Sequence, residues 1–488
     1  MSGPTVGEAV RAAAAAFPDC RARPREQVAR FLTAIGEGIM GLGDALLETC
    51  GAETALPRAR LESERGRTVG QLGLFARVVT EGSWVRARID RAQPDRKPAP
   101  RVDIRSMLVP VGPVAVFGSS NFPFAFSTAG GDTASALAAG CPVIVKAHSG
   151  HPKTSDLVAG VIAAAAKSAG MPAGVFSHVH CDHSGGTALV RAPEVKAAGF
   201  TGSVRAGRAL FDAAASRPDP IPVFAEMGSV NPVVVLPSAL DGDLAGLAGA
   251  LCGSVTLGVG QFCTNPGLVF VIEGLRMEAF VAALAAKIAA TTPATMLTGP
   301  IHSAYVTGLK RMAALPGVAV AGRAAAAPDP AKHEGAAAVL TVSGAVFLRT
   351  PALQEEVFGP STLIVRCVDD RELEAGIASL PGQLTATVHG TEADVAGRPG
   401  LVALLRERSG RLLFSGVPTG VEVGDAMQHG GPWPATTDAR FTSVGSSAIF
   451  RFVRPAAWQG FPDSLLPPAL QDANPLRIHR LVDGVWTV

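Results

Sequence analysis

Several features that would assign a chain to a specialised class are missing from this sequence. Its 43 Lys and Arg residues nearly balance its 41 Asp and Glu residues, which gives a formal net charge of +2. No stripe of basic residues interleaves with aromatic ones, so nucleic-acid binding is not expected. No uncharged run approaches the roughly eighteen apolar residues of a membrane span, so we expect no membrane partner either.

Cysteine is also scarce. The chain has seven cysteines, an odd number, and none of them lies in a C-x-x-C pair. Cysteines scattered in this way do not form a disulfide framework, which indicates a reducing compartment. We therefore expect a cytoplasmic protein, whose 488 residues suffice for two or three domains with large cores.

The arrangement of apolar residues changes along the chain. Helical spacing dominates residues 25–48 and 58–79, and a proline-rich connector follows at residues 93–100. From residue 113 short apolar strands alternate with Ala-rich helices, and a second α/β run extends from about residue 233 to 441. This alternation predicts an α/β fold whose parallel sheets are covered on both faces. Such sheets bind nucleotides beyond the carboxyl ends of their strands.

The first α/β run divides into individual elements. The expected strands are Val114–Phe117, Pro142–Lys146, Val175–Val179 and Val195–Phe200, and the expected helices are Thr128–Ala139 and Ser155–Ala169. A further buried helix is expected over Leu244–Val259. The last residues, 451–488, are proline-rich with few helix signals, and they form either an arm that pairs with another subunit or a simple C-terminal wrap.

One cysteine stands apart from the apolar runs. Cys263 lies in Gly260-Gln-Phe-Cys-Thr-Asn-Pro266, a turn that opens on glycine and closes on proline. A thiol inside a core helix is usually inert, whereas a thiol beside exposed backbone N–H groups can ionise and reach a substrate. Cys263 is therefore a candidate nucleophile, although a loop cysteine that stands alone is more often structural.

Five other places follow predicted strands or open turns. The Asn121 amide can donate to a developing oxyanion, and Lys146 ends a strand where a ribose or phosphate would lie. Gly202-Ser203 opens a helix that could face a pyrophosphate, and the carboxylates of Glu226 and Glu356 could act as general bases. Each residue also has a plain structural interpretation, as a turn residue or a solvated charge.

Taken together, these motifs resemble those of the aldehyde dehydrogenase superfamily. Asn121 and Lys146 are followed in the family's order by four further motifs, which are FTGS at Phe200–Ser203, EMG at Glu226–Gly228, GQxC at Gly260–Cys263 and ExFGP at Glu356–Pro360. Longer segments are similar to a narrower group, the α-ketoglutarate semialdehyde dehydrogenases and related fatty aldehyde dehydrogenases. These segments are Ser120–Ser127, Gly260–Gly267 and Met427–Asp438.

The resemblance implies a mechanism. Cys263 would attack the aldehyde and form a thiohemiacetal and then a thioester, with Asn121 holding the oxyanion. Glu226 would activate the water that hydrolyses the thioester. Residues of the matching motifs would bind the dinucleotide, namely Lys146, Ser149, Gly202, Ser203, Glu356 and Phe358.

The choice of cofactor depends on the residues around the adenosine ribose. NAD-using relatives carry a glutamate three residues after the strand-end lysine, where this chain has Ser149, which leaves room for a 2′-phosphate. NADP-preferring relatives place an arginine near the position of His183, and a neutral histidine is a weaker partner for phosphate. We therefore expect NADP or NAD, with NADP slightly favoured.

The resemblance also predicts the substrate and the organisation of the chain. The substrate would be α-ketoglutarate semialdehyde, an anion that requires a cation at the active-site mouth, and no single arginine stands out in the sequence. Residues 1–91 and 111–228 would form the dinucleotide-binding domain and residues 229–440 the catalytic domain. Residues 92–110 and 441–488 would form an oligomerisation arm and tail of a homodimer or homotetramer.

One segment favours a different enzyme. His178-Val-His180-Cys-Asp182-His183 fits H-x-H-x-D-H, the zinc-binding pattern of metallo-β-lactamase-like hydrolases. The later histidines lack the further motifs that such a site needs, so we expect no resident metal. A non-catalytic nucleotide-binding relative is a third alternative, against which the presence of Cys263, Glu226 and Asn121 argues.

Overall fold

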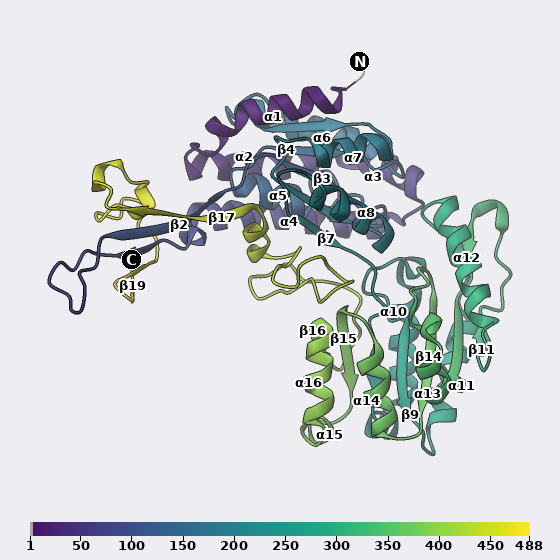
Figure 1. Ribbon diagram of the computed structural model, residues 1–488. Helices are drawn as coiled ribbons and strands as arrows, with labels where there is room; N and C mark the ends of the chain where they lie inside the picture. Colours follow the sequence, from purple (N-terminus) through teal and green to yellow (C-terminus); the bar gives the residue numbers. More distant parts are fainter. Residues whose placement is uncertain (1–2) are drawn as a thin grey trace.

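The computed structural model describes residues 3–488, and its strands form two large sheets, a projecting arm sheet and a two-stranded ladder (Figure 1). All neighbouring strands of the first sheet are parallel, in the order β5-β4-β3-β6-β7. Its strands are β3 (Val114–Phe117), β4 (Val143–Lys146), β5 (Phe176–Val179), β6 (Ala197–Thr201) and β7 (Val223–Glu226). The first sheet therefore confirms the predicted parallel architecture.

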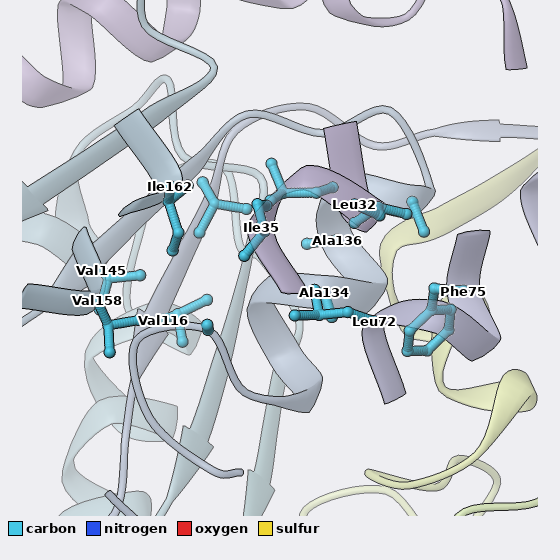
Figure 2. Close-up of a cluster of buried hydrophobic side chains, with 14 of the residues drawn as sticks. Leu32, Ile35, Leu72, Phe75, Val116, Ala134, Ala136, Val145, Val158 and Ile162 are labelled. Carbon is cyan, nitrogen blue, oxygen red and sulfur yellow. The ribbon is translucent and has the colours of Figure 1, made fainter. Parts of the chain in front are cut away.

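Helices cover both faces of this sheet. The helices on the first face are α2 (Arg25–Gly41), α3 (Gly43–Thr54), α4 (Arg58–Glu81), α5 (Gly131–Ala138) and α6 (Pro152–Ser168), and those on the second are α1 (Val6–Cys20), α7 (His183–Arg191) and α8 (Val204–Ala215). Val114 and Val116 point into the first core, whereas Ala115 and Phe117 point into the second, because successive strand residues face opposite sides. Figure 2 shows the first core, in which Val116 and Val145 lie near Ile35 and Ile162.

Some predicted helix boundaries differ from the structure. The helix expected over residues 25–48 is interrupted after Gly41, because Gly43 has a φ of +57°, a left-handed conformation that regular helices do not contain. The helix expected at Thr128–Ala139 begins at Gly131. The helix expected over Leu244–Val259 ends at Thr256, because Gly258 and Val259 have left-handed φ values of 55° and 58°.

The second sheet has seven strands in the order β11-β13-β14-β9-β8-β15-β16, all parallel to their neighbours except the edge strand β11. Its strands are β8 (Val233–Val235), β9 (Leu268–Ile272), β11 (Ala319–Arg323), β13 (Ala338–Ser343), β14 (Ser361–Cys367), β15 (Gln383–His389) and β16 (Ser409–Phe414). Two cores lie on its two faces. The accompanying helices are α9 (Pro237–Asp241), α10 (Leu244–Thr256) and α11 (Met277–Ala289) on one face, and α12 (Gly299–Ala313), α13 (Gly344–Arg349), α14 (Asp370–Ser379), α15 (Glu392–Ala396) and α16 (Pro399–Arg408) on the other.

The arm sheet projects from the rest of the chain (Figure 1). Its order is β17-β2-β1-β18-β19, and its strands are β1 (Arg88–Asp90), β2 (Ile104–Pro110), β17 (Val453–Gln459), β18 (Arg480–Val482) and β19 (Val485–Thr487). Strand β1 pairs in this sheet, so the arm sheet begins before residue 92. The short ladder is formed by β10 (Ala294–Thr295) and β12 (Glu334–Gly335).

The carboxyl ends of the strands in the first sheet face the amino ends of the strands in the second sheet (Figure 1). The chain passes from the carboxyl end of β7 at Glu226 to the amino end of β8 at Val233. The yellow-green segment 415–445 lies between the two sheets in Figure 1 and bonds to β7 through Thr437 and Ala435. Within residues 3–488 no helix has both the length and the apolar character that a membrane crossing requires.

Candidate active site

Four of the predicted site residues follow strands of the first sheet at one edge. Asn121 comes after β3, Lys146 ends β4, Gly202 follows β6 and Glu226 ends β7. Because parallel strands end at the same side of a sheet, these residues line its carboxyl edge. The predicted nucleophile, Cys263, comes from the second sheet, in the loop before β9.

Backbone conformation explains the form of the cysteine loop. Gly258, Val259 and Gly260 all have left-handed φ values, of 55°, 58° and 66°, so α10 cannot continue past them. A Cβ on Gly260 would lie 2.2 Å from the backbone carbon of Gly359. The glycine of the GQxC motif is therefore required by a direct contact between two backbones, whereas a Cβ on Gly359 of the ExFGP motif would lie 2.2 Å from the Tyr305 ring.

A buried asparagine holds this loop in place. The Asn231 amide donates to the carbonyl oxygens of Cys263 (2.8 Å) and Asn265 (2.9 Å). The Asn231 Oδ1 atom accepts from the hydroxyls of Ser229 (2.9 Å) and Thr385 (3.0 Å). Since a fully satisfied buried network is rigid, Asn231 fixes the backbone that carries the thiol.

Two further side chains, those of Glu226 and His429, lie beside the thiol of Cys263. The Sγ atom of Cys263 lies 3.7 Å from Nε2 of His429, which is 3.0 Å from Oε1 of Glu226. The reactive atoms of the three residues lie within 4.8 Å of one another. Ser443 donates its hydroxyl to Oε2 of Glu226, and its N–H donates to the His429 carbonyl at 2.8 Å.

The protonation states in this cluster follow from burial and charge. Burial, and secondly the negative charge of Glu226, hold the pKa of the Cys263 thiol well above its usual range. Burial opposes ionisation of Glu226 as well, but His429, Ser443 and the Cys263 thiol outweigh it and lower the pKa of that carboxyl. The arrangement at neutral pH is therefore a protonated thiol beside an ionised carboxylate, which can accept the thiol proton.

Asn121 lies against the same loop. Its Nδ2 donates to the Gln261 carbonyl at 3.0 Å. A side-chain amide has two N–H groups, so the second remains available for another acceptor. Asn121 and Glu226 therefore reach Cys263 from the first sheet, as the predicted mechanism requires.

The remaining predicted residues border the same two sheet edges. Lys146 is close enough to the 180–183 loop for its charge to oppose the effect of burial on the pKa of Cys181. Gly202 is exposed beside the first turn of the twelve-residue helix α8, where the Ser203 hydroxyl accepts from the Ala206 N–H. Ser149 is also exposed.

The ExFGP motif reaches this region from the second sheet. A Cβ on Gly228 would lie 2.3 Å from Oε2 of Glu356. Glu356 and Phe358 line one small pocket together with Gly260 and Asn265. An exposed helix N-terminus, a strand-end lysine and a carboxylate beside the thiol loop are the groups that fit the phosphates and ribose hydroxyls of a dinucleotide.

The H-x-H-x-D-H segment does not gather its own four side chains into one group; among the described residues, the possible ligands that lie within 4.8 Å of one another here are His178, His180 and Asp156. The Asp182 carboxylate accepts from the Gly185 N–H at 2.9 Å and caps α7, the helix that His183 begins. His178 and His180 instead meet Asp156, whose Oδ1 lies 3.5 Å and 2.7 Å from their ring nitrogens. The hydrolase alternative is therefore not favoured.

His429, Asn231 and Ser443 were not among the predicted site residues. His429 lies inside the quoted segment Met427–Asp438, which was its only signal. Ser443 was expected in an oligomerisation tail, yet it donates to Glu226. Residues 446–452 likewise contribute Ala448, Ile449 and Phe452 to the core of the first sheet, so the expected tail does not begin at residue 441.

The fold and the site together place a thiol, a carboxylate and an imidazole beside a parallel sheet of the nucleotide-binding type. The profile of the aldehyde dehydrogenase family matches residues 2–398. Alpha-ketoglutaric semialdehyde dehydrogenase 2 of Azospirillum brasilense is 53% identical over 470 residues, covering 96% of this chain and 89% of that protein. The alpha-ketoglutaric semialdehyde dehydrogenase of Acinetobacter baylyi is 46% identical over 482 residues, covering 99% and 91%.

Solved structures share the fold. A glyceraldehyde-3-phosphate dehydrogenase from Methanocaldococcus jannaschii, complexed with NADP, superposes with a TM-score of 0.78 at 20% identity, covering 94% of this chain and 95% of that one. The chain belongs to the aldehyde dehydrogenase family, and it is an NAD(P)-dependent enzyme that oxidises an aldehyde. The predicted fold class and reaction class are both confirmed.

Proposed function

We propose that this enzyme oxidises α-ketoglutarate semialdehyde to α-ketoglutarate. Two relatives of that activity match almost the whole chain at 53% and 46% identity. The observation that carries the proposed chemistry is the meeting of Cys263, Glu226 and His429 within 4.8 Å, in contact with a loop that also binds Asn121.

In the first step the thiol proton passes to Glu226 as Sγ of Cys263 attacks the aldehyde carbon. His429, with Nε2 between the thiol and the carboxylate, stabilises the charge that moves between them. The alkoxide that forms accepts from Asn121 Nδ2 and the Cys263 backbone N–H. Each such donor contributes about 3 kcal/mol to the transition state.

A bound dinucleotide would supply the acceptor for the hydride that the second step removes from the Cys263 thiohemiacetal. Glu226 releases the thiol proton to solvent and then takes a proton from the water that attacks the Cys263 thioester. It passes this second proton to Sγ as the carboxylic acid departs, which restores the thiol. The Ser443 hydroxyl keeps the carboxylate oriented during this step. Lys146, Ser149, Gly202, Ser203, Glu356 and Phe358 are the residues that would bind the dinucleotide.

For the cofactor, NADP is slightly favoured over NAD. Ser149, which is small, uncharged and exposed, leaves space for a 2′-phosphate near Lys146, and His183 is exposed at the start of α7. Ser149→Glu would place a carboxylate in that space. The ratio of kcat/KM for NADP to that for NAD should then fall at least tenfold, whereas an unchanged ratio would contradict the assignment.

The proposal extends to assembly and location. Exposed apolar side chains gather on the projecting arm sheet and its loops, which supports a homodimer or homotetramer formed through it; they include Ile104, Phe461, Leu465, Val485 and Trp486. The cysteines bear on the location of the enzyme. All seven are free, which supports a cytoplasmic location. The dinucleotide-binding unit would comprise residues 1–91 and 111–228, and the catalytic unit residues 229–440. Three exceptions apply: β1 pairs in the arm sheet, Ser443 bonds to Glu226, and residues 446–452 pack in the core of the first sheet.

The experiment that tests this function follows NAD(P)H formation with α-ketoglutarate semialdehyde. We expect turnover that disappears in Cys263→Ala and is unchanged by a metal chelator. Cys252→Ala is the matched control, because that cysteine lies in α10 away from the loop. Turnover by Cys263→Ala, or no turnover of any aldehyde by the wild type, would overturn the proposal.

A further inference from the structure

Arg67, on α4, carries a buried charge that the mechanism does not use. Among residues 3–488 no group accepts a hydrogen bond from either terminal guanidinium nitrogen, and both nitrogens are inaccessible to solvent. Its only hydrogen bond runs from Nε to the Val421 carbonyl at 3.3 Å. A buried guanidinium whose terminal donors are unpaired is costly, so an arrangement of this kind indicates a missing acceptor.

The neighbouring carboxylate cannot supply that acceptor. Glu64, one turn earlier on α4, is already paired with Arg60 at 2.6 Å through Oε2. Its Oε1 accepts from the N–H groups of Phe124 (2.8 Å) and Ala125 (2.9 Å). Arg67 therefore lacks a counterion of its own.

The free guanidinium lies close to the reacting groups. Its central carbon is 5.1 Å from the centre of the Phe126 ring, which is 6.1 Å from that of His429. Burial lowers the pKa of Arg67, while the charges of Glu64, Cys263 and Glu226 partly restore it, so all three act on one region. Apolar residues surround Phe126 and make this region water-poor; they are Phe122, Val421, Val423, Met427 and Val444.

Two other arginines near the thiol are already occupied. Arg60 pairs with Glu64 and also donates to the Asn121 carbonyl at 3.4 Å. Arg411 uses its two terminal nitrogens to hold the carbonyls of Gly420 (3.1 Å) and Pro418 (2.8 Å). Arg67 is thus the one of these three arginines whose two terminal nitrogens have no acceptor among residues 3–488.

We propose that Arg67 binds the carboxylate of the substrate and selects ω-oxo acids over neutral aldehydes. This inference rests on the proposed function, since it names the group that distinguishes α-ketoglutarate semialdehyde from an uncharged aldehyde. A guanidinium binds a carboxylate through two parallel hydrogen bonds. The apolar residues around Phe126 exclude water, and this strengthens both bonds. The carboxylate would bind at Arg67 while the aldehyde carbon at the other end reaches Cys263.

The test compares Arg67→Met and Arg67→Lys with the wild type on α-ketoglutarate semialdehyde and on pentanal. For Arg67→Met we expect kcat/KM to fall about 100-fold with the anionic substrate, mostly through KM, and to stay within about threefold with pentanal. Arg67→Lys keeps the positive charge but cannot form two parallel hydrogen bonds to the carboxylate. We therefore expect kcat/KM for the anionic substrate to fall about tenfold. Arg77→Met, which removes an exposed charge from the same helix, is the matched control and should match the wild type with both substrates.

Equal losses with both substrates would overturn the inference, because they indicate a structural role, and so would an unchanged kcat/KM for the anion. A second readout does not depend on the identity of the substrate. In the pentanal assay, the inhibition constant of α-ketoglutarate should rise at least thirtyfold in Arg67→Met, and an unchanged constant would also overturn the inference. Failure of the wild type to oxidise α-ketoglutarate semialdehyde would instead overturn the proposed substrate, so the two failures are distinguishable.

Discussion

Replacing Glu226 with Gln should make the nucleophile more reactive while it slows turnover. The carboxylate lies within 4.8 Å of Cys263 Sγ and raises the pKa of the thiol by repelling the thiolate. Two unit charges at that separation repel by about 3 kcal/mol if the effective dielectric constant is about 20. His429 offsets part of this repulsion, so we expect a gain of about tenfold in thiolate fraction at pH 7.5 rather than the full effect.

The assay is alkylation of Cys263 by iodoacetamide between pH 6 and pH 10 in the absence of nucleotide, quantified by mass spectrometry of the peptide. In the wild type the rate should rise with pH beyond the range of an ordinary thiol, because the folded-state pKa is raised. In Glu226→Gln the curve should move to lower pH. Steady-state kcat should nevertheless fall about 100-fold, because no base activates the hydrolytic water.

The control for this experiment is Glu355→Gln. This neighbouring carboxylate is exposed and paired with Arg311, so its removal changes the net charge equally without affecting the thiol. A curve that moves to higher pH in Glu226→Gln would refute the reasoning, since it would mean that Glu226 stabilises the thiolate. An unshifted curve would show that the two groups do not interact.

Three further predictions concern the oxyanion donor, a buried ion pair and the thiol loop. Asn121→Ala should lower kcat by about 10²–10³ without changing the alkylation rate of the thiol, and a parallel loss of alkylation would contradict its role as a donor. Arg451→Leu leaves Asp132 unpaired, because the two lie 2.6 Å apart and are buried. Urea denaturation should show a loss of about 3–5 kcal/mol, and a loss under 1 kcal/mol would count against this pairing. Gly260→Ala forces a Cβ against Gly359, so we expect an inactive enzyme whose circular dichroism is unchanged; retained activity would contradict this packing.

The sequence predicted the first sheet well because its signals are local. Strand Val114–Phe117 has the same bounds in the structure, and the other three predicted strands agree to within two residues. Strands such as β3 are buried on both faces, where an unpaired polar side chain would be unfavourable. Their sequences are therefore unbroken apolar runs. The two helix boundaries that were wrong near Gly43 and Gly258 depend on left-handed glycines, whose φ values no apolar period encodes.

The site was predicted only as far as local motifs extend. Glu226 ends a strand, Asn121 follows one and Cys263 follows a helix, and these positions are visible in the sequence. His429 and Ser443 lie in the irregular segment 415–445, where neither helix nor strand periodicity marks a buried residue. Nothing in the composition of that segment distinguishes an imidazole in contact with the thiol from a histidine on the surface.

The position of segment 415–445 explains why sequence patterns did not identify His429 and Ser443 as site residues. It forms no strand of either large sheet, but the Ala225 N–H donates to Thr437, the Met227 N–H donates to Ala435, and Ser443 donates to Glu226. These bonds attach it to the carboxyl end of β7, where the Glu226 carboxylate lies. Arg411 holds the start of the same segment through Pro418 and Gly420. The place of His429 beside the thiol therefore depends on contacts with both sheets, which are long-range, and not on the residues adjacent to His429 in sequence.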